Sequence, residues 1–314
     1  MLKIENLTKR YGSHIVVDDL SFCCAPGEVL GFLGPNGAGK STTMKMVTGF
    51  VPPTVGRISI CGHDIDQAPL EARRCIGYLP EGAPCYPEMT PRSFLEFVAD
   101  IRHLTGTDRN TRLDSVIEAL HLAPVLNQVI DTLSKGFKRR VGLAQAIIHD
   151  PEVLILDEPT DGLDPNQKHE VRELIRSMAT NKMIVLSTHI LEEVEAVCTR
   201  AIIIANGSII ADDTPEQLTR RSRYHNAVRL SVGANENLDQ AQAALAQLVS
   251  IDGVEVDPSS RTITVLAGAQ TRDGETWQEG FDLLSRQNWD ITSLQLETGQ
   301  LDQVFREITG GSHA

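Results

Sequence analysis

The feature that most restricts the possible fold of this chain is a glycine-rich segment between an apolar run and a helical pattern. Residues 29–33 form the apolar run, and the segment 34–41 that follows fits the pattern G-x-x-x-x-G-K-S. The run is typical of a buried strand, and residues 40–49 carry a helical pattern that ends at a glycine. In a strand–loop–helix unit of this kind, loop N–H groups and the positive end of the helix surround a phosphate. The segment therefore predicts a nucleotide-phosphate site in an α/β domain.

This loop supplies the residues expected to hold the nucleotide and a magnesium ion. The Lys40 ammonium would reach the β and γ phosphates, and the Ser41 hydroxyl would ligate Mg²⁺. The nucleotide-binding residues expected in this segment are Gly34, Pro35, Asn36, Gly37, Ala38, Gly39, Lys40, Ser41 and Thr42.

Two carboxylates follow a second apolar run at residues 153–156. Ligands of α/β sheets gather at the carboxyl ends of the strands, so we expect Asp157 and Glu158 to face the glycine-rich loop. Asp157 would hold Mg²⁺ through water. Glu158 would then orient and deprotonate the attacking water, because the first carboxylate is occupied and a base is still needed.

A short segment between these two motifs, Leu133-Ser134-Lys135-Gly136, narrows the class of protein. In this order, the three motifs resemble those of the nucleotide-binding subunits of ABC transporters, over about residues 2–220. The resemblance implies an α/β fold, a P-loop NTPase of the ABC type. Such a fold has a mostly parallel sheet core, an antiparallel β subdomain and a helical subdomain, here at about residues 84–150. It also implies a homodimer that holds two ATP molecules between its subunits and hydrolyses them to drive transport.

The same resemblance assigns roles to single residues along the chain. Tyr11 would stack on adenine, and Asp164 would lie against the phosphate-binding loop of the other subunit. Ser134 and the Gly136 amide would contact the γ phosphate of the nucleotide bound by the other subunit. His189 would sense the γ phosphate. The expected catalytic residues are Glu158, His189 and Lys40.

The chain departs from the family's commonest pattern at two places. Glu81 stands where the family usually has glutamine, and it is expected to contact the nucleotide and Mg²⁺. A carboxylate can ligate Mg²⁺ as an amide oxygen does, but it adds negative charge and cannot donate a hydrogen bond. We expect Glu81 to retune hydrolysis. Lys135 and Phe137 replace the commonest glycine and glutamine beside Ser134.

Beyond the basic cluster at residues 220–223, the pattern changes to that of a small α+β domain. Its strand–helix–strand–strand–helix–strand order predicts a ferredoxin-like fold. We expect an ABC ATPase domain at residues 1–222 and an accessory domain at residues 223–314. The elements expected in the second domain are strands at 227–232, 254–257, 262–266 and 291–296 and helices at 238–248, 276–287 and 301–308.

The composition of the chain indicates which classes of partner are excluded and where in the cell the protein is expected. The net charge of −13 disfavours general nucleic-acid binding, because an acidic chain repels a polyphosphate backbone. The six cysteines show no C-x-x-C spacing and indicate neither a metal site nor a disulfide framework. We find no transmembrane run and no secretion pattern at the start of the chain. The expected location is the cytoplasmic face of the inner cell membrane, where the chain would be peripheral and attached through a permease.

The resemblance extends less specifically to one kind of transporter. The sequence Tyr78-Leu79-Pro80-Glu81, the short signature at 134–136 and the C-terminal appendage resemble bacterial exporter ATPases, including multidrug and gliding-motility types. A separate permease would dock on the helical subdomain and on segment 81–90. Two alternatives remain open: a soluble ABC-type ATPase that acts on ribosomes or DNA, and a nucleotide-sensing regulatory module.

Overall fold

The computed structural model describes residues 1–234, 236–247, 251–268 and 289–310. Contacts divide the chain into two compact units, Met1–Thr214 and Pro215–Ala314. The domain boundary expected after residue 222 stays a prediction. Within the described residues, no helix combines the length and the apolar character that crossing a membrane requires.

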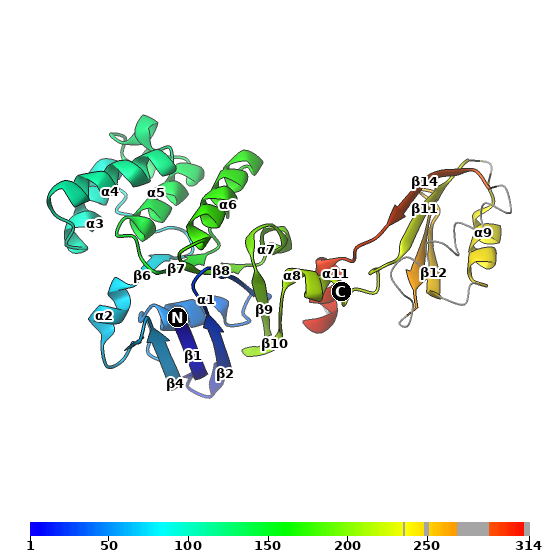
Figure 1. Cartoon of the computed structure of the whole chain (residues 1–314), viewed down its shortest axis with the longest axis horizontal. Coiled ribbons are helices and arrows are strands. Elements are labelled where there is room, and N and C mark those ends of the chain that lie inside the picture. The colour runs from blue at the N-terminus through cyan, green and yellow to red at the C-terminus, as the bar shows by residue number, and fades with distance from the viewer. Residues whose placement is uncertain (235, 248–250, 269–288, 311–314) are drawn as a thin grey trace. The chain divides into compact units, whose positions relative to one another are not determined.

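A six-stranded sheet forms the centre of the first unit. Its strands are β3 (Val29–Leu33), β6 (Ile76–Leu79), β7 (Val153–Asp157), β8 (Met183–Thr188), β9 (Arg200–Ala205) and β10 (Ser208–Asp213). They lie in the order β10-β9-β3-β8-β7-β6, and all neighbours are parallel except the antiparallel pair β10–β9 (Figure 1). The mostly parallel core predicted from the sequence is confirmed.

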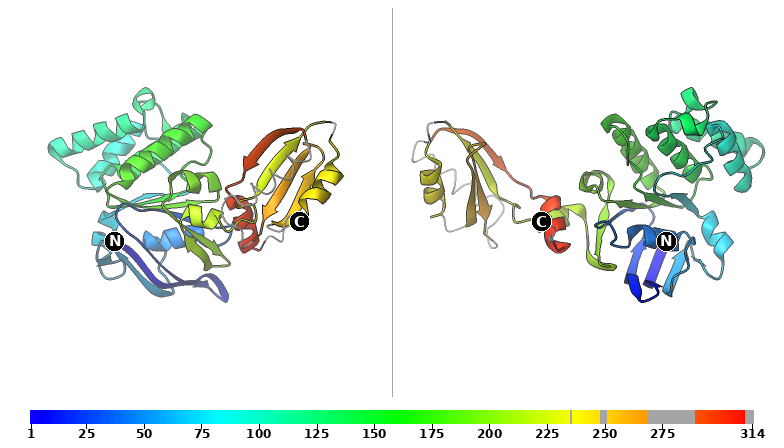
Figure 2. Two further views of the ribbon diagram at one scale, coloured as in Figure 1. Left: turned by 45° about the vertical axis from the view of Figure 1, so that its right-hand side comes forward. Right: turned by 180° about the vertical axis from the view of Figure 1, so that it is seen from behind.

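The inner strands are buried on both faces, which explains why they read as continuous apolar runs. In β7, Leu154 and Leu156 join one hydrophobic core, while Val153 and Ile155 join the other. The first core contains the helices above the sheet in Figures 1 and 2, and the second contains α1 (Lys40–Val47) and an antiparallel sheet below it.

The antiparallel sheet comes from the start of the chain. Its strands are β1 (Leu2–Tyr11), β2 (His14–Cys24), β4 (Val55–Ile60) and β5 (His63–Asp64), in the order β2-β1-β4-β5. The chain turns tightly after Tyr11, which pairs with His14. The first two strands are 10 and 11 residues long.

The helical subdomain is confirmed, and it is inserted in the sequence between the neighbouring strands β6 and β7. It contains α3 (Pro91–Ile101), α4 (Gly106–Ala119) and α5 (Lys135–Ile147), with short 3₁₀ turns at Ala123–Val125 and Ile130–Thr132. Thr90 caps α3 in a reciprocal arrangement with Ser93. The remaining helices of this unit are α2 (Pro69–Arg74), α6 (Pro165–Ala179) and α7 (Leu191–Val197).

The second unit has the strand order predicted for a ferredoxin-like domain. Its elements are α8 (Pro215–Thr219), β11 (Val228–Val232), α9 (Leu238–Leu245), β12 (Ile251–Asp257), β13 (Thr262–Ala267), β14 (Ile291–Leu296) and α11 (Leu301–Ile308). The sheet is antiparallel in the order β12-β13-β11-β14, and α9 packs on β12 and β13. The helix predicted at 276–287 lies outside the described residues.

Candidate nucleotide site

The loop between β3 and α1 adopts a backbone that requires glycine at several positions. Gly37 and Gly39 have φ values of 82° and 105°, in the region that side chains disfavour. A Cβ on Gly34 would lie 2.5 Å from the carbonyl oxygen of Ile204, so no side chain fits there. The glycines let the chain turn sharply from the strand into the first turn of α1, whose N–H groups are free to face a ligand.

Lys40 is buried inside this loop, with only 7% of its surface exposed. Its Nζ donates to the carbonyl oxygens of Gly34 at 2.6 Å and Pro35 at 3.2 Å. Burial lowers the pKa of Lys40, and the nearby carboxylates of Glu158 and Asp157 oppose that shift. The loop therefore holds a cation where the motif predicts a phosphate-binding lysine.

A cleft of about 240 Å³ opens over the loop. It brings together most of the polar residues that the sequence predicted for nucleotide binding, including Glu81 and Glu158 from other elements. The lining residues are Val16, Asn36, Gly37, Gly39, Lys40, Ser41, Thr42, Glu81 and Glu158. The pattern of motifs gave no reason to include Val16, which reaches the cleft because β2 passes beside the loop.

Asp157 lies at the end of β7 with 1% of its surface exposed. Neither carboxylate oxygen makes a well-formed hydrogen bond within the described part of the chain. Burial raises the pKa of Asp157, while the neighbouring hydroxyls of Ser187 and Ser41 lower it. A buried carboxylate without hydrogen bonds is costly unless a cation compensates it. Asp157 and Ser41 together therefore fit a hard divalent cation such as Mg²⁺, which prefers oxygen ligands.

Glu158 is held by contacts from the end of β8. Its N–H donates to the carbonyl oxygen of Ser187 at 2.8 Å. Its Oε1 lies 2.9 Å from Nδ1 of His189, whose side chain is 55% exposed. Thr188 Oγ1 lies 3.4 Å from the second carboxylate oxygen and 2.9 Å from Oε2 of Glu193. The structure thus joins two predicted catalytic residues in one contact and adds Thr188, which the motifs did not indicate.

Arg139 of α5 is a further residue that the motif analysis missed. Its buried guanidinium donates to the carbonyl oxygens of Asp157 at 3.0 Å, Pro159 at 3.2 Å and Pro80 at 3.3 Å. These carbonyls lie beside Glu158 and directly before Glu81, so one side chain fixes both segments. The sequence does contain a signal for Arg139. It is a charged residue on the same face of the helix as Gly136 and Leu143, which are buried.

The signature and loop residues expected to act on a second subunit lie away from this cleft. Ser134 caps α5 and accepts from Phe137 N, and Asp164 caps α6 and accepts from Gln167 N. Gly136 is buried against Gln167, and a Cβ there would lie 2.3 Å from the side-chain oxygen of Gln167. None of Ser134, Gly136 and Asp164 belongs to the lining of the cleft in the described chain. Their predicted contact with another subunit's nucleotide stays a prediction.

Tyr11 lies outside the lining of the cleft in the same way. Its ring is half exposed, and the Lys9 ammonium lies 4.9 Å from the ring centroid. The ring is therefore accessible to a flat ligand, but its predicted stacking on adenine stays a prediction.

The fold and the loop geometry agree with comparisons to known proteins. Residues 17–161 match the family model described as ABC transporter. The linearmycin resistance ATP-binding protein LnrL of Bacillus subtilis (strain 168) is 33% identical over 317 residues, which cover 99% of this chain and 98% of LnrL. A Nod factor export ATP-binding protein I from Ralstonia nicotianae is 38% identical over 316 residues, covering 99% of this chain and 94% of that protein.

Solved structures give the same result. A structure described as the ATP binding subunit of an ABC transporter has a TM-score of 0.66 and 33% identity, covering 70% of this chain and 92% of that one. The structure of cbiO1 from Clostridium perfringens, described as part of the ABC transporter complex cbiONQ, has a TM-score of 0.63 and 27% identity. That match covers 70% of this chain and 90% of that one.

The chain belongs to the ABC transporter family. Within this family it is an ATP-binding subunit and an ATPase, and ATP is its nucleotide. The family and the activity that the three sequence motifs predicted are confirmed.

Proposed function

We propose that two copies of this chain bind two ATP molecules head to tail, and that hydrolysis drives a separate membrane permease in export. The observation that carries this proposal is the position of Glu158, which lines the cleft over the phosphate-binding loop and contacts His189 at 2.9 Å. A carboxylate oriented by a histidine beside a phosphate site is suited to position and deprotonate a water molecule.

In this proposal, Lys40 and the N–H groups of the loop bind the phosphates of ATP. Ser41 and Asp157 hold Mg²⁺, the second of them through water, and Glu81 contributes a further oxygen. When bound, Mg²⁺ neutralises charge on the phosphates. The buried, unbonded carboxylate of Asp157 supports this assignment.

Glu158 acts as the base in this scheme, and His189 acts as its partner and as the sensor of the γ phosphate. The exposed position of His189 supports contact with a group that enters from outside. Thr188 positions Glu158, because its hydroxyl lies between the carboxylates of Glu158 and Glu193.

The second subunit completes each site. Ser134 and the Gly136 amide contact the γ phosphate bound by the other chain, Asp164 lies against the other chain's phosphate-binding loop, and Tyr11 stacks on the adenine of its own nucleotide. The exposed positions of Ser134 and Asp164 at the starts of α5 and α6 support this, since helix N-termini favour anions.

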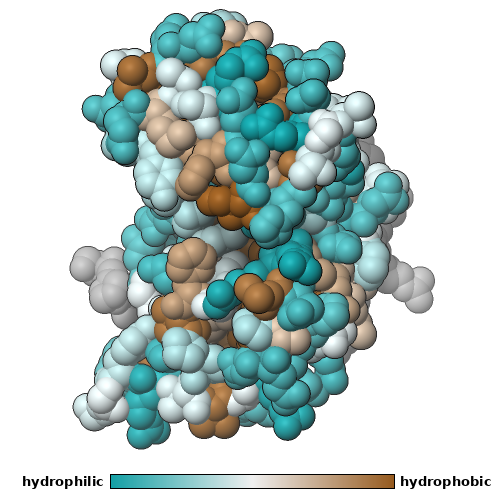
Figure 3. Space-filling view, turned by 90° about the vertical axis from the view of Figure 1, so that its left-hand side faces the viewer, coloured by the Kyte–Doolittle hydropathy of each residue, from teal (hydrophilic) through white to brown (hydrophobic). Residues whose placement is uncertain are grey.

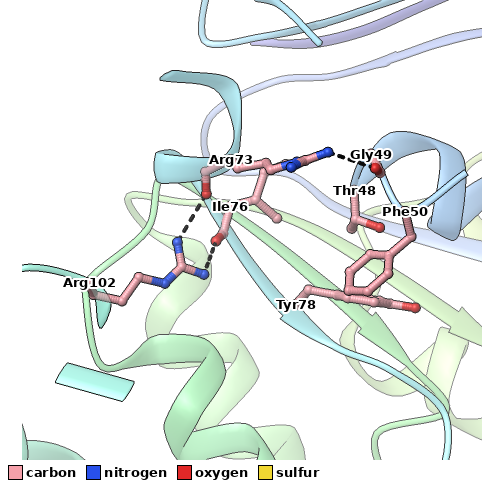
Figure 4. A pocket seen from close by; sticks show the side chains of 7 residues that line it. All are labelled: Thr48, Gly49, Phe50, Arg73, Ile76, Tyr78 and Arg102. Atoms are coloured by element: carbon pink, nitrogen blue, oxygen red, sulfur yellow. Dashed lines mark hydrogen bonds between the residues drawn. The ribbon is translucent and has the colours of Figure 1, made fainter. Parts of the chain in front are cut away.

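The permease docks on segment 81–90 and on the surface beside it. Tyr86 is half exposed and packs edge-on against Phe97 of α3 at 5.6 Å. A pocket of about 370 Å³ opens nearby, where the 73% exposed Phe50 faces Tyr78 at 5.7 Å (Figure 4). Figure 3 views the side of the molecule that carries α2 and α3 and shows a hollow with apolar patches around it. An apolar surface of this kind suits a protein partner.

Export is the direction that the names of the relatives support, since one is called a Nod factor export protein and another a linearmycin resistance protein. The chain would then work on the cytoplasmic face of the inner cell membrane, attached through its permease. The permease, rather than this chain, would select the cargo.

The exchange of Glu158 for glutamine tests the catalytic assignment. Glu158→Gln keeps the shape of the side chain but removes the base, so hydrolysis should fall about a hundredfold or more while ATP affinity is kept. The ATP-bound dimer should persist longer on a sizing column. The matched control is Glu118→Gln on the exposed side of α4, which should hydrolyse ATP normally. Normal turnover by Glu158→Gln would exclude the base assignment.

A second experiment tests the docking surface. Phe50→Asp replaces the exposed aromatic ring beside Tyr78 with a charge and should weaken co-purification with the membrane permease, without changing basal ATP hydrolysis. Val55→Asp is the matched control, because Val55 is also exposed but lies on the antiparallel sheet. Equal co-purification of both variants would place the permease elsewhere.

A further inference from the structure

Two cysteines and a glutamate from three separate segments meet at the amino ends of the central strands. Cys61 directly follows β4, Cys75 ends α2, and Glu152 directly precedes β7. Their two sulfur atoms and a carboxylate oxygen all lie within 4.8 Å of one another. The spacing of these residues in the sequence gives no indication of this cluster.

Backbone hydrogen bonds of the sheets fix the position of each residue. Val153 N donates to the carbonyl oxygen of Cys75 at 3.0 Å, which places Glu152 beside Cys75. Met183 N donates to the carbonyl oxygen of Glu152 at 2.9 Å, and Cys61 N donates to that of Met1 at 3.1 Å. The cluster therefore belongs to the rigid part of the unit, which is the requirement for a pre-organised binding site.

The spacing of the three side chains matches a tetrahedral metal centre. With Zn–S bonds of about 2.3 Å, two coordinating sulfur atoms lie about 3.8 Å apart, so small rotations of the side chains would bring them into place. Thiolates select soft or borderline cations, and a carboxylate oxygen is an accepted third ligand of Zn²⁺. The fourth position would be taken by water, since Glu152 is exposed and both cysteines are only partly buried.

The electrostatics of the cluster favour a cation once the thiols lose their protons. The Cys75 thiol lies 3.5 Å from the carbonyl oxygen of Glu71, to which it donates. A divalent cation would offset the three negative charges in part.

We propose that Cys61, Cys75 and Glu152 bind a thiophilic divalent cation of the Zn²⁺ class. Binding releases one proton from each thiol and forms two metal–sulfur bonds and one metal–oxygen bond, without any change in oxidation state. The ion cross-links the β4–β5 corner, the end of α2 and the start of β7. It thereby braces the starts of β6 and β7, whose opposite ends lead to Glu81 and Asp157.

Cobalt binding to the reduced full-length chain tests this proposal. Co²⁺ should give the thiolate-to-metal charge-transfer absorption of a two-sulfur centre, Zn²⁺ should abolish it by displacement, and two protons should appear for each ion bound. Cys61→Ser and Cys75→Ser should each weaken binding more than about a hundredfold. Loss of a residue that only hydrogen-bonds to a metal ligand weakens metal affinity by up to about a hundredfold, and loss of a ligand itself should cost more. Glu152→Gln replaces the charged oxygen ligand with a neutral one and should weaken binding at least about tenfold.

Cys85→Ser is the control, because Cys85 is also half-buried but lies in segment 81–90. It should bind Co²⁺ as the unchanged chain does. Circular dichroism and ATP binding would show that each variant is folded. The proposal is overturned by the absence of a charge-transfer band, or by a band that survives the combined change of Cys61 and Cys75.

Discussion

The Arg139 side chain joins the two backbone segments that carry Glu158 and Glu81. It donates to carbonyl oxygens on both sides of Glu158 and to the one that precedes Glu81. It contacts neither group directly, so it acts as a positioning residue.

Replacing Arg139 should therefore change turnover more than nucleotide affinity. Arg139→Ala leaves three buried carbonyl oxygens without their charged donor and should lower the free energy of unfolding by about 2–4 kcal/mol. It should also reduce kcat for ATP at least about tenfold with little change in KM. Arg139→Lys restores one donor and should recover part of kcat. Lys138→Ala, which removes an exposed ion pair with Asp131, is the control and should leave both parameters unchanged.

His149 should make the stability of the protein depend on pH. Burial and the nearby Arg102 lower the pKa of His149 to about 4, and its Nε2 lies 3.0 Å from the carbonyl oxygen of Ile76. Because the folded-state pKa lies below the unfolded value of about 6.5, protonation favours the unfolded chain. The contribution is complete above pH about 6.5 and is lost as the pH falls towards about 4, up to about 3 kcal/mol.

Urea unfolding at a series of pH values checks this prediction. His149→Gln can still donate to Ile76 but does not titrate, so its stability should fall less between these pH values than that of the unchanged chain. Parallel pH profiles of the two proteins would contradict the assignment to His149.

At the level of single residues, motifs identified the groups expected to touch ATP but not those that hold them. Lys40, Asp157 and Glu158 could be found because phosphate and Mg²⁺ chemistry restricts the residue type at each position. Arg139 and Thr188 act through carbonyl and carboxylate oxygens, and many residue types can serve such a role. The roles of Arg139 and Thr188 depend on which strands and helices pack together. The sequence alone did not determine that packing.

At the level of elements, β6 and α5 show the closest approach of a glycine to a backbone atom within the described residues. A Cβ on Gly77 would lie 2.1 Å from the carbonyl oxygen of Ala146, a backbone atom that cannot turn away. Gly77→Ala should therefore separate the strand from the helix and lower the free energy of unfolding by about 1–3 kcal/mol. Gly253→Ala in β12 is the matched control, since its nearest neighbour would be Leu266 Cδ1 at 3.8 Å. Thermal unfolding of both variants measures the difference, and equal melting temperatures would disprove the expected clash.

The predicted elements were most accurate where burial sets the pattern. The inner strands of the central sheet are apolar on both faces, so the apolar run at 153–156 located β7 to within one residue. In contrast, α4 begins at Gly106, seven residues before its first buried residue, Leu113. Its first two turns are polar and exposed, and Leu113 and Val116 are the buried residues of this helix. Periodicity could not indicate a start that packing does not require.

At the level of the whole molecule, the position of α8 bears on where the chain can be divided. This helix packs against α11 and groups with the second unit, although the sequence placed it in the ATPase domain. A chain ending at Thr214 should therefore remain folded, bind ATP and stay soluble. A chain ending at Ser222 would keep α8 without α11 and should aggregate more readily.

Size-exclusion chromatography and ATP binding of the two shortened chains measure this difference. If the chain ending at Ser222 behaves better, then α8 belongs to the ATPase domain and the boundary expected from the sequence is right. If either shortened chain still dimerises with ATP, then the accessory domain is not essential for dimerisation.

The backbone of Glu158 has a consequence for how this position can change during evolution. Its φ of 52° lies in the left-handed region, which glycine and asparagine tolerate better than glutamate does. Holding a glutamate there costs on the order of 1 kcal/mol. A replacement by glycine or asparagine would thus make the fold more stable while it removes the carboxylate. Selection for folding alone would therefore favour the loss of this glutamate, and only selection for turnover would keep it.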